Sequence, residues 1–395
     1  MTIFSKSFVF ILIFSFGFYL MYNQAFNKFP SDTKTHIYHA AKFAPGKVVE
    51  VSYPMWHASV YVVSKSLGVD LKYGAALVTA FVIMALAMSI FTIVKWSLKD
   101  ELPNLSFNQK EYLFLGMTIT LMVMAAVYVP FFNKRQFLGQ ASCGVWHNVT
   151  LLMVKPFALF SLYTLVKYLE TKQLKWMLIS ALIILLSIYA KPSFIIAFLP
   201  AVFMFFVLFV MRQMKLNVLQ VFTHIIDIFK RFKQEILFLI ILAFLSALIL
   251  WAQYISIYNG ENTQNKVIFD FLGVWSFYSP NIFGSLLLTY LFPLAVLLFV
   301  NQKKSNTYYL SLITTVVAVL LLSCFAEEGR YHDGNFGWSQ QVAVQMFFVM
   351  SLIEFVKNYS YLQNWKIYII SITLSLHIIS GVFYLGKILK GLSYA

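Results

Sequence analysis

The polar segment SDTKTHIYHA, residues 31–40, follows the first apolar stretch of the chain and holds an acid and two histidines. Ser31 is a good N-cap, so a helix is expected to begin here, and Asp32, His36 and His39 would then share one helix face. One acid beside two imidazoles can supply a general base, with Asp32 as the candidate. The same three side chains can ligate a divalent metal, and an amphipathic helix with a wet polar face is the third interpretation.

Two lysines lie where apolar segments begin or end. Lys155 is expected about two turns inside a membrane span, and it is followed by Pro156, which frees backbone carbonyls. A lysine at that depth costs ~2.5–3.5 kcal/mol on insertion scales, which indicates either a function or an ammonium that reaches outward to the headgroups. Lys191, in YAKPSF, lies between two spans with almost no loop and suits either a phosphate or a simple anchoring role.

The segment CFAEEGRYHDGNFGW, residues 324–338, is a third polar cluster. Its three glycines permit close approach of the backbone to a ligand, and Arg330 can bind a phosphate with two hydrogen bonds. Glu327, Glu328 and His332 are further candidates for substrate binding. The aromatic residues of this segment can stack on a sugar ring or belong to the interfacial belt.

The elements that must position these residues are membrane spans. Of the 395 residues, 60% are hydrophobic and 11% are charged, whereas soluble domains carry roughly 25% charged residues. Such a chain cannot cover a globular surface with polar groups, and windows of about 20 apolar residues recur along it. We therefore predict an all-α fold, a polytopic transmembrane helix bundle.

Hydropathy predicts eleven spans in a single integral-membrane domain, residues 1–395. The expected spans are 7–22, 73–94, 112–130, 149–166, 176–190, 193–211, 236–253, 283–300, 308–324, 340–356 and 367–386. Residues 23–72 are interpreted as a first outer loop with interfacial helices, and residues 325–339 as a polar outer loop. We expect Trp56 to help hold the first loop against the membrane, and a further interfacial amphipathic helix at about 214–233.

The distribution of basic residues places the N-terminus on the cytoplasmic side. The short turns NQKKSN (301–306) and KYLETKQLK (167–175) are rich in lysine, as the positive-inside rule predicts for short inner loops. On this topology, five of the seven histidines and eight of the fifteen acids lie on the outer side. We therefore expect the chemistry on that face.

Several classes of protein are disfavoured. The net charge of +15 comes from dispersed basic residues rather than a patch with interleaved aromatics, so no nucleic-acid partner is predicted. Cys143 and Cys324 show neither metal-ligand spacing nor a disulfide framework. The sequence holds no Walker A, GxGxxG, GxSxG or HExxH motif, and no internal repeat typical of a secondary transporter. No cofactor is required by a motif, and a divalent metal at Asp32, His36 and His39 stays open.

The arrangement resembles the GT-C superfamily of integral-membrane glycosyltransferases, of the type that builds bacterial envelope polysaccharides. Its members have many spans, take a sugar from a polyprenyl-phosphate carrier and place an acid in the first outer loop. Asp32 of SDTKTH stands at that position in this chain. Many members carry a second acid there, whereas Ser31 and Thr33 flank Asp32. The segments KPSF and HDGNFGW also look like those of bacterial envelope-polysaccharide membrane proteins.

The resemblance implies transfer of a sugar from a polyprenyl-phosphate carrier to a glycan or lipid acceptor, among the lipids of a bacterial inner (plasma) membrane and on its outer face. Asp32 would remove the acceptor proton while cations stabilise the departing phosphate. The candidate cations are Lys155, Lys191 and Arg330. The residues that would orient the acceptor or the carrier phosphate are His36, His147 and His332. An O-antigen or capsule polymerase, and a lipid or polysaccharide flippase or transporter, stay open as alternatives.

Overall fold

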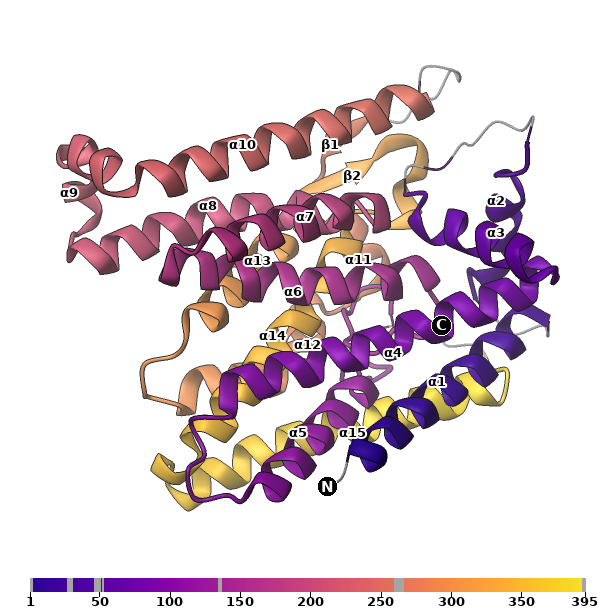
Figure 1. The fold of residues 1–395 in the computed structure, drawn as a ribbon, viewed down its shortest axis with the longest axis horizontal. Coiled ribbons are helices and arrows are strands. Elements are labelled where there is room, and N and C mark those ends of the chain that lie inside the picture. The colour runs from indigo at the N-terminus through magenta and orange to yellow at the C-terminus, as the bar shows by residue number, and fades with distance from the viewer. Residues whose placement is uncertain are drawn as a thin grey trace.

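The computed structural model describes residues 3–26, 31–45, 51, 53–133, 137–258 and 266–392. Within these residues, nine helices are long and apolar enough to cross a membrane, so the chain is a multi-pass integral membrane protein (Figure 1). These helices are α1 (Ile3–Phe26), α4 (Leu71–Leu98), α6 (Val149–Thr171), α8 (Ser193–Met214), α10 (Ile225–Tyr258), α12 (Ile282–Phe299), α13 (Asn306–Cys324), α14 (Gly337–Asn358) and α15 (Asn364–Leu389).

Shorter elements connect the spans. The helices are α2 (Thr33–Ala41), α3 (Met55–Leu67), α5 (Phe107–Val123), α7 (Leu174–Ala190), α9 (Val218–Thr223) and α11 (Gly273–Tyr278), with 3-10 turns η1 (Glu328–Asp333) and η2 (Tyr359–Tyr361). The strands β1 (Val267–Phe269) and β2 (Phe325–Glu327) pair antiparallel, with Ile268 opposite Ala326. We call the end of the bundle that carries α2 and α3, at the right of Figure 1, the Asp32 end.

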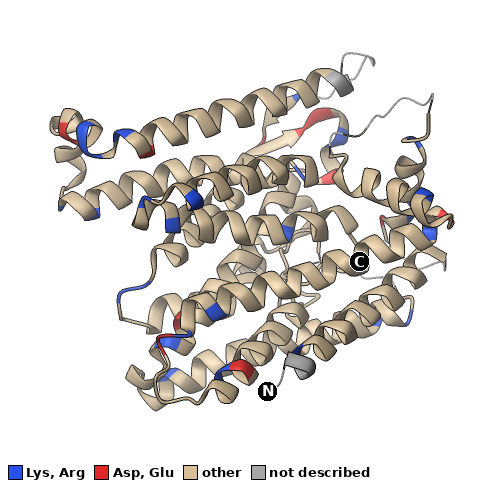
Figure 2. Ribbon diagram, viewed as in Figure 1, with Lys and Arg blue, Asp and Glu red and all other residues tan. Residues whose placement is uncertain are grey.

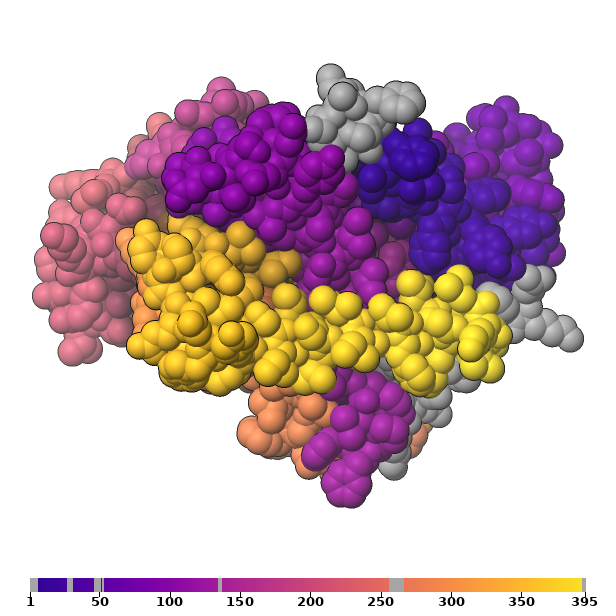
Figure 3. Space-filling view, turned by 90° about the horizontal axis from the view of Figure 1, so that it is seen from below, coloured from indigo at the N-terminus to yellow at the C-terminus, as the bar shows by residue number. Residues whose placement is uncertain are grey.

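Packing is arranged around α14, whose side chains are almost all buried. Helix α13 packs on α14 and α8, α6 packs on α7 and α4, and α1 packs on α4. Helices α10 and α15 lie at the periphery, and Figure 3 shows α15 as a yellow band across one face. Figure 2 shows that charged residues gather toward the ends of the helices, which leaves a largely uncharged band, as a hydrocarbon core requires.

The expected span 112–130 is wrong, because its helix α5 ends at Val123. The chain then forms what we call the buried hairpin, residues 124–128 and 140–147. Gly144 N donates to Met124 O at 2.9 Å, and Ala125 N donates to the carbonyl of His377 in α15 at 3.2 Å. Non-helical backbone is tolerated at membrane depth where other parts of the protein satisfy its polar groups. The expected span 176–190 corresponds to α7, an apolar helix of 17 residues.

His377 connects the buried hairpin to an interruption in α12. Its Nδ1 donates to Ala125 O at 2.7 Å, and its Nε2 accepts from Phe292 N at 3.3 Å. Helix α12 departs from helical geometry at Tyr290 and contains Pro293, which has no N–H to donate. The neutral imidazole of His377 therefore satisfies one backbone carbonyl of the buried hairpin and one backbone N–H of α12, neither of which has a helical partner.

Three local predictions also need correction. Asp32, not Ser31, occupies the N-cap position of α2, although Thr33 N donates to the Ser31 hydroxyl at 3.4 Å. Trp56 is not a membrane anchor, since it is fully buried and donates to Thr79 Oγ1 at 3.0 Å. The expected helix at 214–233 is divided between α9 and the start of α10, which bends at Phe232.

Candidate functional site

Asp32 is held in place by a hydrogen bond of its own backbone N–H and by the contacts of the next residue, Thr33. Asp32 N donates to the His147 carbonyl at 3.3 Å. The Thr33 hydroxyl donates to Gln24 Oε1 at 3.1 Å, and Gln24 Nε2 donates to the Trp146 carbonyl at 2.9 Å. These contacts fasten the start of α2 to α1 and to the end of the buried hairpin, so the carboxylate has a defined position.

The Asp32 carboxylate faces the first turn of α6. Its Oδ2 accepts a hydrogen bond of 2.9 Å from Nδ2 of Asn148, the N-cap of α6. The other end of that amide, Oδ1, accepts from Leu151 N at 2.9 Å and from the Thr150 hydroxyl at 3.1 Å. Burial raises the pKa of Asp32, while the bond from Asn148 and the charge of Lys191 act in the opposite direction.

Lys191 lies at the junction of α7 and α8. Helix α7 ends at Ala190, and the next peptide is extended because Pro192 disfavours a helical conformation in the residue before it. The connection is therefore too short to carry Lys191 away from the bundle, and this lysine is only 6% exposed.

The Lys191 ammonium sits in a cage of one hydroxyl and two rings. Nζ donates to Thr150 Oγ1 at 3.1 Å and lies 5.0 Å from the ring centroid of Tyr53 and 4.9 Å from that of Trp338. Burial lowers the pKa of Lys191 to about 8, and the negative charge of Asp32 acts in the opposite direction. The group therefore carries a charge that is poorly solvated and suited to an anion.

We call the hydrogen-bonded series Asp32, Asn148, Thr150 and Lys191 the Asp32–Lys191 chain. It joins α2, α6 and the α7–α8 junction, and no direct ion pair between the two charged groups occurs among the described residues. Because Lys191 is buried and Asp32 is half-buried, their electrostatic effect on a bound substrate is stronger than in water. The arrangement can remove a proton at one end and stabilise an anion at the other.

The structure places His36 one turn after Asp32 in α2, and the His36 ring pairs with His57. Its Nδ1 lies 3.0 Å from Nε2 of His57 in α3, and His57 Nδ1 lies 3.2 Å from the Tyr53 carbonyl oxygen. Burial lowers the pKa of His36 to about 2 and that of His57 to about 4. Among the described residues no group of three His, Cys, Asp or Glu side chains can hold a metal ion, so the ligand set of Asp32, His36 and His39 gains no support.

Lys155 and His147 have structural partners. The Lys155 ammonium is buried and donates to the Cys143 carbonyl, which fastens α6 to the buried hairpin. It does not snorkel outward, and no contact in the described part places it on the Asp32–Lys191 chain. His147 Nδ1 lies 2.8 Å from the Tyr384 hydroxyl, and burial lowers its pKa to about 3. Both cysteines are free.

The polar segment 324–338 reaches the rim of the site. Arg330 Nε pairs with Asp333 at 2.7 Å, is about half exposed, and interacts electrostatically with Tyr53, one wall of the Lys191 cage. Glu327 accepts from Asn335 at 2.8 Å, whereas Glu328 is exposed. The His332 ring lies 4.1 Å from the Phe277 ring. Of the charged candidates in this segment, Arg330 is therefore the one linked to a wall of the Lys191 cage, and Trp338 of the same segment is itself a wall of it.

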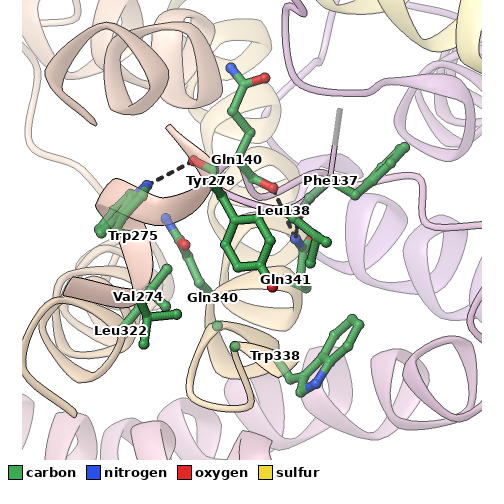
Figure 4. Close-up of a pocket in the computed structure, with 13 residues that line it drawn as sticks. Phe137, Leu138, Gln140, Val274, Trp275, Tyr278, Leu322, Trp338, Gln340 and Gln341 are labelled. Atoms are coloured by element: carbon green, nitrogen blue, oxygen red, sulfur yellow. Dashed lines mark hydrogen bonds between the residues drawn. The ribbon is translucent and has the colours of Figure 1, made fainter. Parts of the chain in front are cut away.

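A cavity adjoins the Lys191 cage through a shared wall, Trp338 (Figure 4). Its volume is about 30 Å³, which is room for a water molecule rather than for a sugar. Figure 4 shows Tyr278 between Trp275 and Trp338.

Four residues of the site were not predicted from the sequence. They are Tyr53, His57, Asn148 and Thr150. Asn148 carried a usable signal, since an asparagine directly before an apolar run is a good N-cap. The others are brought to the site only by the packing of the helices.

No protein-family model matches the chain, and no curated protein matches it. The fold and the site define it as a multi-pass helical membrane protein with a half-buried aspartate and a buried lysine linked at one end of the bundle.

Proposed function

We propose that this protein is a membrane glycosyltransferase that moves a sugar from a polyprenyl-phosphate carrier to a hydroxyl of a glycan or lipid acceptor on the outer face of the membrane. The observation that supports this most is the Asp32–Lys191 chain, which holds a candidate base and a candidate phosphate-binding cation in one hydrogen-bonded network.

The proposed step forms one bond and breaks one. The acceptor oxygen attacks the anomeric carbon, and the bond from that carbon to the phosphate oxygen breaks with its electron pair leaving on the phosphate. Asp32 takes the acceptor proton, and its raised pKa makes it a stronger base than an exposed aspartate once it is ionised. Lys191 neutralises the charge that develops on the phosphate, where burial increases its effect.

The surroundings of Lys191 suit the sugar, the phosphate and the polyprenyl tail of the proposed donor. Tyr53 and Trp338 offer ring faces beside the ammonium, and such faces stack on sugars. Arg330, at the rim, supplies a second cation that can bind phosphate with two hydrogen bonds. The hydrocarbon-crossing helices supply the apolar environment that a polyprenyl tail requires.

The test is transfer of a labelled sugar from a polyprenyl-phosphate donor by the purified full chain in lipid nanodiscs. Asp32→Asn should lower the rate about 100-fold or more, as loss of a general base does. Asp70→Asn is the matched control, because Asp70 caps α4 by accepting from Lys72 N at 2.8 Å and asparagine caps equally well. Equal rates for the two variants, both folded, would contradict the proposal.

One observation favours a second candidate, movement of a lipid-linked saccharide across the membrane. Interrupted helices and buried non-helical backbone at membrane depth, as in the buried hairpin and α12, are typical of transporters. A vesicle assay that follows the leaflet of a labelled polyprenyl-phosphate sugar distinguishes the two functions. Transfer without movement supports the glycosyltransferase, and movement without transfer supports the alternative.

A further inference from the structure

The two hydrogen bonds of the His36–His57 pair determine where its protons lie. The Tyr53 carbonyl oxygen can only accept, so His57 Nδ1, at 3.2 Å, must carry a hydrogen. In a neutral imidazole this leaves His57 Nε2 as an acceptor. His36 Nδ1, which lies 3.0 Å from that nitrogen, must then carry its own hydrogen. The unprotonated nitrogen of the series is therefore Nε2 of His36.

The pair adjoins the Asp32–Lys191 chain. His36 is one turn after Asp32, and its N donates to the Asp32 carbonyl at 3.1 Å. The charged and titratable groups that face the pair are Lys191 from the α7–α8 junction, His39 from α2 and Tyr53 from the segment before α3. Lys191 and burial both oppose a second positive charge, so the imidazoles stay neutral.

We infer that His57 is a positioning residue that fixes the tautomer of His36, and that Nε2 of His36 accepts a hydrogen bond from the acceptor substrate's hydroxyl. This inference rests on the proposed function and names a feature of its acceptor, a second hydroxyl group next to the one that reacts. Asp32 receives the proton in this arrangement. His36 orients the hydroxyl.

The division of roles follows from the environments of the two groups. A half-buried carboxylate whose pKa lies above its ordinary value binds a proton readily, whereas an imidazole with a pKa of about 2 does not. His36 therefore cannot serve as an effective proton acceptor near neutral pH. It can still accept a hydrogen bond, and the fixed tautomer ensures that the bare nitrogen is always the same one.

The first experiment determines the tautomer of His36 and does not depend on enzymatic activity. Nitrogen-15 NMR of the full chain labelled at histidine, in nanodiscs, separates protonated from bare ring nitrogens, and the His36 signals are identified by their loss in His36→Asn. We expect hydrogen on Nδ1 and none on Nε2. The opposite tautomer in the wild-type protein would overturn the inference, even if no variant of His57 folds.

The second experiment compares two substitutions of His57. His57→Gln keeps an acceptor for His36 and a donor for the Tyr53 carbonyl, so it should preserve the His36 tautomer and the KM for the acceptor. His57→Leu removes both groups and should raise that KM about 3- to 10-fold, as loss of one hydrogen bond does, with little change in kcat. His224→Leu, at the start of α10 and away from the site, is the control.

The outcomes separate the two proposals. Sugar transfer with an unchanged KM in folded His57→Leu overturns the positioning role and leaves the proposed function standing. The expected tautomer in a protein that transfers no sugar overturns the proposed function, and with it the role of the acceptor hydroxyl.

Discussion

The Lys191 ammonium lies 3.1 Å from the hydroxyl oxygen of Thr150, and this contact ties the end of α7 to the first turn of α6. The Thr150 hydroxyl also donates to Asn148, whose amide donates to Asp32. The beginning of α6 therefore positions the acid and the cation of the site together. A disturbance of this turn should affect both charges at once, whereas a disturbance elsewhere on α6 should not.

Replacement of Asn148 by serine separates capping from catalysis. Serine caps a helix about as well as asparagine, so the stability of the fold should change by less than about 0.5 kcal/mol. Serine cannot place an amide N–H on the Asp32 carboxylate, and hydrogen bonds to charged groups contribute roughly 1.5–3 kcal/mol. We expect transfer to slow about 10- to 100-fold, measured with thermal unfolding on the same samples. Full activity in a stable Asn148→Ser protein would rule out this role.

The pH profile of kcat/KM should have an alkaline limb set by Lys191. The ammonium binds the donor phosphate only while it is protonated, and the pKa of Lys191 is lowered to about 8, so activity should fall as pH rises through about 8. Asp32 must be ionised, and its pKa is raised, so activity should also fall at acid pH, above the ordinary range of an aspartate.

Lys191→Arg tests the origin of the alkaline limb. A guanidinium stays charged up to about pH 12, so the limb should disappear even if the rate is lower throughout. Lys65→Arg, on the exposed face of α3, should leave the profile unchanged. An alkaline limb near pH 8 that persists in Lys191→Arg would assign it to another group.

Lys155→Met should affect stability rather than chemistry. The ammonium of Lys155 donates to the Cys143 carbonyl, and its removal leaves that buried oxygen without this donor, at a cost of about 1–3 kcal/mol. The activity per folded molecule should stay within about threefold of wild type, a change of less than about 0.7 kcal/mol in the activation barrier, because within the described residues Lys155 contacts the buried hairpin and not the Asp32–Lys191 chain. The measurements are thermal unfolding and transfer rate on the folded fraction. A stable but inactive Lys155→Met protein would restore Lys155 to the site.

Gly381 permits α15 to lie directly against the buried hairpin. A Cβ added to Gly381 would overlap the carbonyl oxygen of Val123 and crowd Ala125 N, and backbone atoms cannot move aside cheaply. Gly381→Ala should therefore destabilise the protein by at least about 1–3 kcal/mol, measured by chemical or thermal unfolding.

The control for this prediction lies on the same helix. A Cβ at Gly386 would meet no atom within 4 Å, so Gly386→Ala should be neutral or stabilising by up to about 1 kcal/mol through helix propensity. Equal stability of the two variants would show that the close approach at Gly381 is not needed.

Composition and hydropathy alone determined that this is a helical membrane protein, because a chain so poor in charge needs lipid as its solvent. They also located most spans to within a few residues, since apolar length depends only on local sequence. Asp32 and Lys191 were recognisable for the same reason: a charged residue beside a span is conspicuous against apolar neighbours.

The tertiary structure decided which polar residues meet. Helix α5 stops at Val123 because His377, about 250 positions away in the chain, satisfies the backbone that follows, and hydropathy cannot register a distant hydrogen-bond partner. The His36 ring meets His57 because α3 packs against α2. Lys155 and Lys191 look alike in the sequence, but one ammonium meets a carbonyl of the buried hairpin and the other a hydroxyl of the site. Local sequence determines where a helix crosses the membrane, whereas its rotation and its neighbours are determined by packing across the whole bundle.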